Sequence, residues 1–342
     1  MKHLVLVGAC YLDTILTVPD FPSEDAKLRA TSLTVRRGGN CPNTLQVFHQ
    51  LVQSSPTTPR VASHLISPLP SHSSPATQQI LSSFDDDPST STDQADGTSR
   101  ATSTTGTEER KSVLEFGCCL YREEHSSPAS SYIVRSSATS SRTIINYNEL
   151  KEMSFEEFVR IADEITSSVE SEDGDADGPW WHFEGRIPET TLLCIRHLRR
   201  ISPRSTISVE VEKPNRDGLS ELAAEANIVF YSRTWAESRG YVSAEACLRG
   251  EAFASEAALM LCTWGSYGAT AYSPAPADEC ISISPSRPDI QVVDTVGAGD
   301  TFIAGMLYGL ICHTDDWSRE AKLRFAVELA TKKVQREGFA GL

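Results

Sequence analysis

The sequence lacks several features that define large classes of protein. No apolar run among its 342 residues approaches 18 residues, the length that a membrane-spanning helix requires. Its nine cysteines are odd in number and include no C-x-x-C pair, so no regular disulfide framework is expected. Basic residues (31) are outnumbered by acidic ones (46), and the formal charge of −15 argues against nucleic acid or an anionic membrane as partner.

Two further absences narrow the function. No secretory signal precedes the first expected strand, which begins at Leu4, so we expect a cytoplasmic protein with reduced thiols. No G-x-G-x-x-G motif follows that strand, which argues against a dinucleotide-binding oxidoreductase. The eight histidines show no metal-ligand spacing and no Cys/His cluster indicates structural zinc, so we expect His182 to be a hydrogen-bonded core residue.

Short apolar runs alternate with helical patterns along most of the chain. Buried strands are expected at residues 4–8, 227–231 and 258–262, and residues 181–185 and 207–212 alternate as strands do. Helices are expected after Asn40 and over residues 156–165. This alternation predicts a mainly parallel sheet covered on both faces, with residues 132–135 and 142–147 forming antiparallel strands outside it.

One segment breaks the pattern. Residues 85–107 are rich in Ser, Thr and Asp and contain no large apolar residue. Such a segment cannot offset the entropy lost on ordering, so we predict a disordered insertion. We expect residues 1–342 otherwise to form a single domain.

The most informative motif is Asp294-Thr-Val-Gly-Ala-Gly-Asp300, which precedes an apolar helical run. Gly297 and Gly299 allow close approach of a ligand to the backbone, and a helix start supplies free N–H groups that bind phosphate. Asp300 would place a base beside the bound phosphoryl group, as transfer of phosphate to a hydroxyl requires. The alternative is an ordinary glycine turn with Asp300 as a helix cap.

Several segments together resemble the ribokinase-like (pfkB-type) sugar kinases, and within them the ketohexokinase branch. They are residues 37–43 (RGGNCPN), 141–144 (SRTI), 181–186 (WHFEGR), 209–214 (VEVEKP), 246–250 (ACLRG) and 293–302 (VDTVGAGDTF). The resemblance implies an α/β ribokinase-like fold, in which a Rossmann-like, mainly parallel sheet flanked by helices carries a small β-sheet lid. The lid is expected from about residues 10–36 and 115–147.

The same resemblance implies a function. It is ATP-dependent phosphorylation of a ketose, D-fructose to fructose 1-phosphate, with Mg²⁺ and a potassium-type monovalent ion, in a homodimer whose lids clasp each other. Another sugar or nucleoside kinase of the same family remains an alternative, because the expected sugar-binding residues do not by themselves separate ketose from aldose. A catalytically silent sugar-binding regulator is a second alternative, against which the intact Asp300 argues.

The resemblance also assigns roles to individual residues. Asp300 is the expected general base, and the anion hole is expected from the backbone N–H groups of Gly297, Ala298, Gly299 and Asp300. The expected sugar-binding residues are Asp13, Asp25, Gly39, Asn40, Asn43 and Asp300, with Asp25 reaching across the lid clasp. The expected ATP-binding residues are Arg142, Gly265, Ser266, Tyr267, Gly268, Gly297 and Gly299. Singly, each has an ordinary alternative as a turn residue, a cap or an exposed strand arginine.

Metal binding stays open at this point. Many members of the broad family place an Asn and a Glu three residues apart after the strand that here ends at Tyr231, but this chain has Ser232-Arg-Thr-Trp235. The magnesium ligands are therefore unassigned. Residues 173–184 satisfy the EF-hand pattern D-x-D-x-D-G-x₅-E, yet a strand is expected where the exit helix of a calcium loop should begin, so we favour an acidic surface loop.

Overall fold

The computed structural model describes residues 1–84, 112–139, 141–172, 178–274, 276–287 and 290–342. The insertion expected at residues 85–107 and the first five residues of the EF-hand pattern, 173–177, lie outside the described residues.

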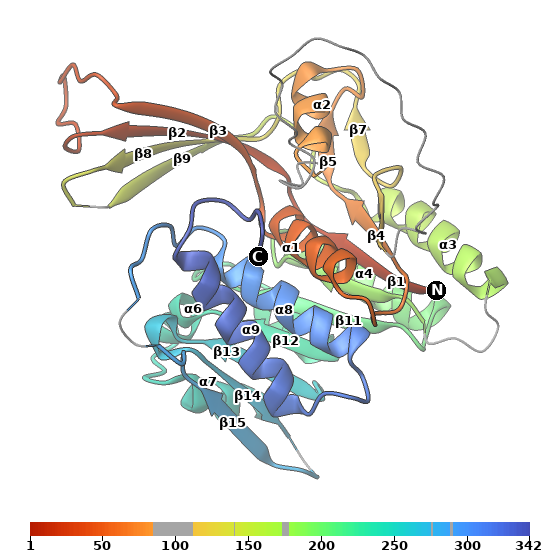
Figure 1. Cartoon of the computed structure of the whole chain (residues 1–342). Coiled ribbons are helices and arrows are strands. Elements are labelled where there is room, and N and C mark those ends of the chain that lie inside the picture. The colour runs from red at the N-terminus through yellow and green to blue at the C-terminus, as the bar shows by residue number, and fades with distance from the viewer. Residues whose placement is uncertain (85–111, 140, 173–177, 275, 288–289) are drawn as a thin grey trace.

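The described residues form a main sheet of nine strands in the order β15-β14-β13-β12-β11-β10-β1-β4-β6 (Figure 1). The strands are β1 (Lys2–Val7), β4 (Val61–Ile66), β6 (Ser112–Glu115), β10 (Trp180–Phe183), β11 (Thr206–Val211), β12 (Ile228–Tyr231), β13 (Leu259–Thr263), β14 (Ala269–Ser273) and β15 (Glu279–Ile283). Neighbours from β13 to β6 run parallel, and β14 and β15 add antiparallel pairs at one edge. The expected buried strands and their parallel arrangement are confirmed.

Helices cover both faces of this sheet because its strands are apolar on both sides. One face packs against α1 (Asn40–Ser54), α8 (Ala298–Cys312) and α9 (Arg319–Val334), with α2 (Pro75–Ser82) at its edge. The other face packs against α3 (Phe155–Glu172), α4 (Pro188–Ile201), α5 (Leu219–Glu225), α6 (Arg233–Ser238) and α7 (Ala244–Glu251).

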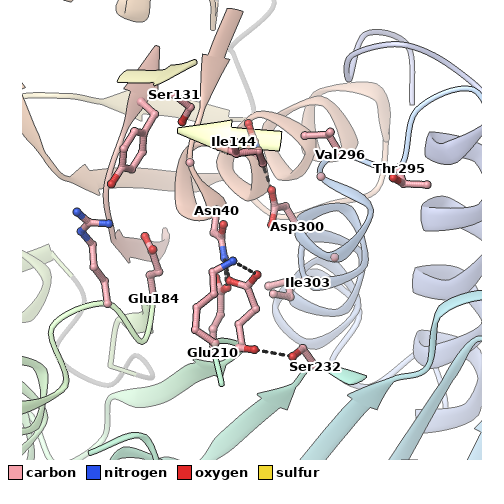
Figure 2. Close-up of a pocket in the computed structure, with 18 of the residues that line it drawn as sticks. Asn40, Ser131, Ile144, Glu184, Glu210, Ser232, Thr295, Val296, Asp300 and Ile303 are labelled. Carbon is pink, nitrogen blue, oxygen red and sulfur yellow. Dashed lines mark hydrogen bonds and ion pairs between the residues drawn. The ribbon is translucent and has the colours of Figure 1, made fainter. Parts of the chain in front are cut away.

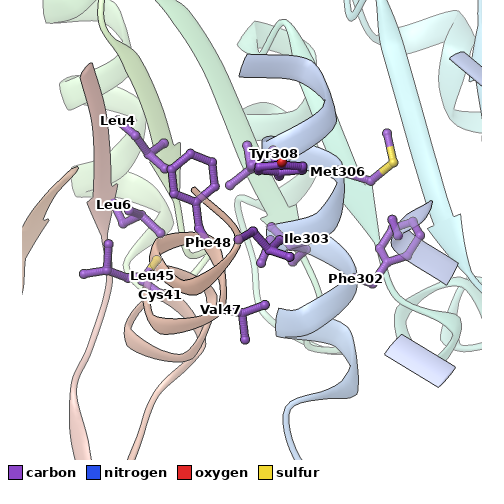
Figure 3. Packing of buried hydrophobic residues seen from close by; sticks show 14 of the residues in the cluster. Leu4, Leu6, Cys41, Leu45, Val47, Phe48, Phe302, Ile303, Met306 and Tyr308 are labelled. Carbon is purple, nitrogen blue, oxygen red and sulfur yellow. The ribbon is translucent and has the colours of Figure 1, made fainter. Parts of the chain in front are cut away.

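The helices α1 and α8 bring the two halves of the site together. Their buried side chains interlock over β1, where Phe48 packs between Leu4 and the α8 residues around Ile303 (Figure 3). Phe48 and Leu4 are fully buried. Burial of each such side chain stabilises the fold by about 1.5–3 kcal/mol. The start of α1 is thereby fixed beside the start of α8.

The lid is a separate four-stranded sheet that extends from the body of the molecule (Figure 1). Its strands, in the order β3-β2-β8-β9, are β2 (Tyr11–Val18), β3 (Ser32–Gly38), β8 (Ser130–Ser136) and β9 (Arg142–Tyr147). β8 and β9 pair antiparallel, as expected. The expected fold class, an α/β ribokinase-like domain with a small β-sheet lid, is confirmed.

The second lid segment begins at Ser130 and not near residue 115. β6 lies beside β4 in the main sheet, where Leu114 packs against the core. β7 (Leu120–Arg122) pairs with β5 (Pro68–Pro70) in a small separate ribbon. Residues 115–129 therefore connect the main sheet to the lid without pairing in it.

The strand order reverses at β1. The chain moves from β1 to β4 and β6 on one side, then returns to β10 on the other side of β1 and continues outward. Open α/β sheets bind ligands at the carboxyl ends of strands beside such a reversal. The segments that follow β1, β10 and β11 are therefore the expected walls of a site.

Candidate active site

A cavity of about 440 Å³ lies at this position, between the lid and the carboxyl ends of the central strands (Figure 2). The expected site residues that line it are Asp13, Gly39, Asn40, Asn43, Arg142, Gly297, Gly299 and Asp300. They come from segments more than 250 residues apart in the sequence, so the fold has assembled a single site from β2, the start of α1, β9 and the start of α8.

Asp300 occupies the first turn of α8 and is nearly buried. Its Oδ2 accepts a hydrogen bond from Asn43 Nδ2 at 2.7 Å, and its backbone carbonyl accepts one from the Thr44 hydroxyl at 3.2 Å. Burial raises the pKa of Asp300 well above its ordinary value, and the nearby Glu210 adds to this, while the hydrogen bond from Asn43 opposes it. An aspartate with a raised pKa is a stronger base once it is ionised.

Asn43 holds this carboxylate in a fixed orientation. Its Oδ1 accepts a hydrogen bond from Arg37 Nη1 at 3.2 Å, so both ends of the Asn43 amide are occupied. The Arg37 guanidinium is itself held by Ser83 and Gln46. The structure thus gives Asn43, which was expected to contact the sugar, the position of a support for Asp300.

The turn before α8 has the backbone conformation that a glycine-rich anion site needs. Gly297 is the N-cap of α8 and has a left-handed φ of 77°, and a Cβ here would strike the ring of Phe339. Gly297 and Gly299 both line the cavity. The backbone N–H of Ala298 donates to the Thr295 carbonyl at 3.3 Å and so differs from the free anion-hole donor that was expected.

The lid covers the cavity with one face of its sheet. Asp13, Ser131, Ile133, Ile144 and Asn146 alternate with outward-facing residues and point into the cavity. Asp13 is buried, and burial raises its pKa, which a hydrogen bond with Ser131 and the nearby arginines partly oppose. This wall offers carboxylate, hydroxyl and amide groups to a polar ligand.

Gly39 lines the cavity, but its main requirement comes from the protein itself. Its φ is 108°, and a Cβ at this position would overlap the Ala9 carbonyl oxygen. A glycine is therefore needed to let α1 begin beside the end of β1, whether or not a ligand is bound.

Three glutamates to which the sequence analysis assigned no site role line the opposite wall. Glu184 follows β10, Glu210 lies in β11 and Glu212 follows it. Asn40 Nδ2 donates to Glu210 Oε2 at 2.7 Å and to Glu212 Oε2 at 2.9 Å, and Glu184 Oε2 accepts from the Ala9 N–H at 2.9 Å. The available signal was their place in the segments 181–186 and 209–214, which carry the family resemblance, at the carboxyl ends of two expected strands.

The environment of these carboxylates disfavours their charge. Burial raises the pKa of Glu184 to about 7, with a further contribution from Glu210. Burial likewise raises the pKa of Glu210 to about 8, with a further contribution from Glu212. Both carboxyl groups are therefore partly protonated near neutral pH, and a cation bound beside them would favour their ionised forms.

Not every expected site residue lies at the cavity. Asp25 sits in the turn between β2 and β3, is exposed and has a positive φ of 61°. It is absent from the cavity lining of this single chain. The loop of Gly265, Ser266, Tyr267 and Gly268 follows β13 and also lies outside the lining, although Thr263 at the end of β13 belongs to it.

His182 is confirmed as a hydrogen-bonded core residue. It is fully buried, with Nδ1 at 2.9 Å from Ser208 Oγ and Nε2 at 3.0 Å from Glu210 Oε1. The fold also brings Cys41 close to His182 and Glu210, a grouping of potential metal ligands that spacing did not predict. The Cys41 thiol donates to the Val7 carbonyl and burial raises its pKa, so it is a protonated core group.

All nine cysteines are free thiols. Over the part of the chain that the structure describes, no helix has both the length and the apolar character of a membrane span.

Comparisons with known proteins identify the family of the chain. The chain matches the model of the pfkB family carbohydrate kinases over residues 120–341. It is 27% identical to the ketohexokinase of Mus musculus over 349 aligned residues, which cover 100% of this chain and 99% of that protein.

Solved structures share the fold at low identity. The ribokinase of Giardia lamblia superposes with a TM-score of 0.72 at 15% identity, covering 99% of this chain and 95% of that one. The ribokinase of Arabidopsis thaliana, determined with ribose and ATP, superposes with a TM-score of 0.66 at 17% identity, covering 99% and 94%.

Fold and family model together define a phosphotransferase that uses ATP to phosphorylate a sugar or nucleoside. The chain belongs to the pfkB family of carbohydrate kinases, whose members use ATP with Mg²⁺.

Proposed function

We propose that this kinase phosphorylates a ketose, D-fructose at its 1-hydroxyl, with Asp300 as the general base. The observation that supports this most is the placement of Asp300, held by Asn43, across one cavity from the polar lid wall around Asp13. The full-length similarity to a ketohexokinase favours a ketose over other sugars.

The proton of the sugar hydroxyl passes to Asp300 as the phosphoryl group is transferred. Asn43 engages Oδ2 of Asp300, which leaves Oδ1 to face the hydroxyl. Phosphoryl transfer depends mainly on positioning and on neutralising charge, and a positioned base contributes about 10²–10⁴ in rate. The lid side chains Asp13 and Asn146 orient the sugar by hydrogen bonds to its other hydroxyls.

The start of α8 binds the transferred phosphoryl group. The first N–H groups of a helix have no acceptor within the helix and carry partial positive charge. Here α8 begins at Ala298, directly after its N-cap Gly297, and Gly299 lies in its first turn. Arg142, at the lid end of the cavity, supplies a guanidinium to the developing charge. The nucleotide extends from this turn past Thr263 toward the Gly265–Gly268 loop.

The carboxylate wall fits a magnesium ion. Mg²⁺ prefers oxygen ligands, and Glu210 and Glu212 present carboxylate oxygens that converge on one amide nitrogen of Asn40. Glu212, the more exposed of the two, and Glu184 would hold the ion at the nucleotide. When bound, Mg²⁺ supplies positive charge to the ATP phosphates.

A homodimer through the lid completes the proposal. The lid face that turns away from the cavity exposes Leu33, Val35, Tyr132, Ile145 and Tyr147. A contiguous apolar face of this kind marks an interaction surface. In the dimer, Asp25 at the tip of one lid would reach the sugar site of the partner chain.

The experiment that tests the substrate is ATP consumption with fructose, tagatose, ribose, glucose and adenosine, with a no-sugar control for background hydrolysis. The product is then identified by ³¹P and ¹H nuclear magnetic resonance. We expect turnover with fructose and a phosphate on its 1-position. Turnover confined to another sugar or to adenosine would overturn the ketose proposal and keep the kinase, and binding of fructose without turnover would favour a silent regulator.

A further inference from the structure

The ammonium of Lys333 is buried directly behind the phosphate-binding turn. Lys333 lies in α9 and is fully buried. Its Nζ donates to three oxygen atoms, the backbone carbonyl of Asp294 at 3.1 Å, Asp294 Oδ2 at 3.1 Å and the backbone carbonyl of Arg336 at 3.4 Å. An ammonium has three donors, so this cage uses all of them.

The cage joins the phosphate-binding turn to the C-terminal segment. Asp294 Oδ1 accepts from the Val296 N–H at 2.9 Å, and its Oδ2 also pairs with Arg36 at 3.2 Å. The N–H groups of Val293 and Asp294 donate to the Val334 carbonyl. The ammonium and these backbone bonds thus tie the start of the loop that precedes Gly297 to the end of α9.

Phe339 extends the same support to Gly297. The Lys333 ammonium lies 5.3 Å from the centre of the Phe339 ring, within the range of a cation–π interaction. That ring packs where a Cβ on Gly297 would be. A charge at Nζ therefore stabilises the left-handed turn through Asp294 on one side and Phe339 on the other.

A monovalent metal ion serving this turn would need the oxygen ligands that Lys333 already occupies. Potassium binds carbonyl and carboxylate oxygens, and the carboxylate and carbonyl of Asp294 and the carbonyl of Arg336 form such a set. With the ammonium in place, this set is filled. The potassium-type ion that the family resemblance implies does not fit these residues.

We infer that Lys333 is a positioning residue whose ammonium serves as a built-in monovalent cation for the phosphate-binding turn, so that the kinase needs no potassium. The inference rests on the proposed role of this turn in binding phosphate, and it is independent of which sugar is the substrate. Lys333 acts through Asp294 and the backbone and touches no reacting atom.

The test compares cation dependence of the wild type with that of Lys333→Ala and Lys333→Met. Each is assayed in potassium, ammonium and tetramethylammonium chloride at equal ionic strength, using whichever sugar supports turnover. The wild type should differ by less than about twofold between salts. Loss of hydrogen bonds to a charged group predicts a fall in kcat of about tenfold or more for Lys333→Ala in tetramethylammonium.

The two variants distinguish the effect of the charge of the Lys333 side chain from the effect of its volume. Lys333→Ala leaves room for an ion, so potassium or ammonium should restore its kcat at least in part. Lys333→Met fills the space without charge and should stay impaired in every salt. Lys332→Ala, an exposed neighbour in the same helix, is the matched control and should behave as the wild type.

Melting temperatures give a readout that needs no substrate. In the absence of sugar and ATP, the melting temperature of Lys333→Ala should be higher in potassium or ammonium than in tetramethylammonium. The melting temperature of the wild type should be the same in all three salts. Wild-type turnover that rises fivefold or more with potassium would overturn the inference. So would full activity of Lys333→Ala in tetramethylammonium, or an equal effect of potassium on the melting temperatures of both proteins.

Discussion

Side chains of this site are held in pairs, in which one group fixes the position of the other. Asp300 is the proposed base, and Asn43 determines which of its oxygens remains free. Arg37 and Lys333 play the same supporting part for Asn43 and Asp294. The effect of a substitution at a supporting residue should therefore appear in the ionisation or position of its partner.

Asn43→Ala tests this at the base. The hydrogen bond from Asn43 lowers the pKa of Asp300, so its removal should move the acid limb of the kcat/KM profile to higher pH. We expect kcat to fall about tenfold to a hundredfold, with a small change in KM. Steady-state kinetics between pH 5 and 9 measure both quantities, and an acid limb that is unchanged or moves to lower pH would show that Asn43 has only a structural role.

Candidate site residues could be predicted from the sequence where they lie close together in one short motif. The glycines, Asp300 and the helix start lie within one short segment, so the motif is visible without a structure. The pairing of Lys333 with Asp294 spans 39 residues and depends on how α9 packs beside the turn. No spacing rule could have indicated it.

At the level of elements, the parallel strands were predictable because their apolar runs are short and continuous. The alternating pattern of residues 207–212 predicted a strand, but it did not indicate that Ser208 and Glu210 are both buried in β11. They are buried because they meet His182 and Asn40 across the strands and helix. Buried polar residues in a central strand thus indicate the position of the site. This indication can be used only when the order of the strands in the sheet is known.

The lid is the element where sequence and structure differ most. Residues 115–129 were expected in the lid, but Glu115 ends a strand beside β4 and residues 120–122 pair with β5. Which of two sheet edges a short strand joins depends on its neighbours in space. The residues on the outward face of the lid could likewise be identified only after the residues that face the cavity were known.

Ile145→Asp tests the role proposed for that outward face. Ile145 is 60% exposed and lies opposite Tyr132 in the pairing of β8 with β9. If two lids pack through this face, burying the new carboxylate is unfavourable and the dimer should dissociate. Light scattering coupled to size exclusion should report twice the chain mass for the wild type and one chain mass for the variant.

Phe253→Asp is the control, because Phe253 is also an exposed apolar residue (96% exposed) but lies outside the lid, in the turn after α7. It should leave the mass unchanged. A wild-type protein that is monomeric at micromolar concentration, or an Ile145→Asp variant that remains dimeric, would contradict the lid interface.

For the whole molecule, the acidic wall of the cavity should make stability depend on pH. Glu184 and Glu210 have pKa values of about 7 and about 8 in the folded chain, against 4.5 when unfolded. Above pH 6.5 the folded protein therefore binds more protons than the unfolded one, and stability falls as pH rises toward 8. The buried His64 and His182 have lowered pKa values of about 4 and about 3, and they affect stability below pH 6.5.

Scanning calorimetry between pH 6.5 and 8 measures this dependence. We expect the melting temperature of the ligand-free wild type to fall by about 5 °C over this range. Glu210→Gln should show a clearly smaller fall, whereas Glu221→Gln, an exposed residue in α5, should match the wild type. A melting temperature that stays constant or rises over this range would show that the carboxylates are not stabilised in their protonated form.

The central claim, that Asp300 is the base of a sugar kinase, is tested most directly by Asp300→Asn. The amide keeps an oxygen that can accept the hydrogen bond from Asn43 but cannot take up a proton from the sugar. Calorimetric titration with the substrate sugar should give a Kd within about threefold of the wild type, while kcat falls by about 10³ or more. Turnover within tenfold of the wild type would contradict the account.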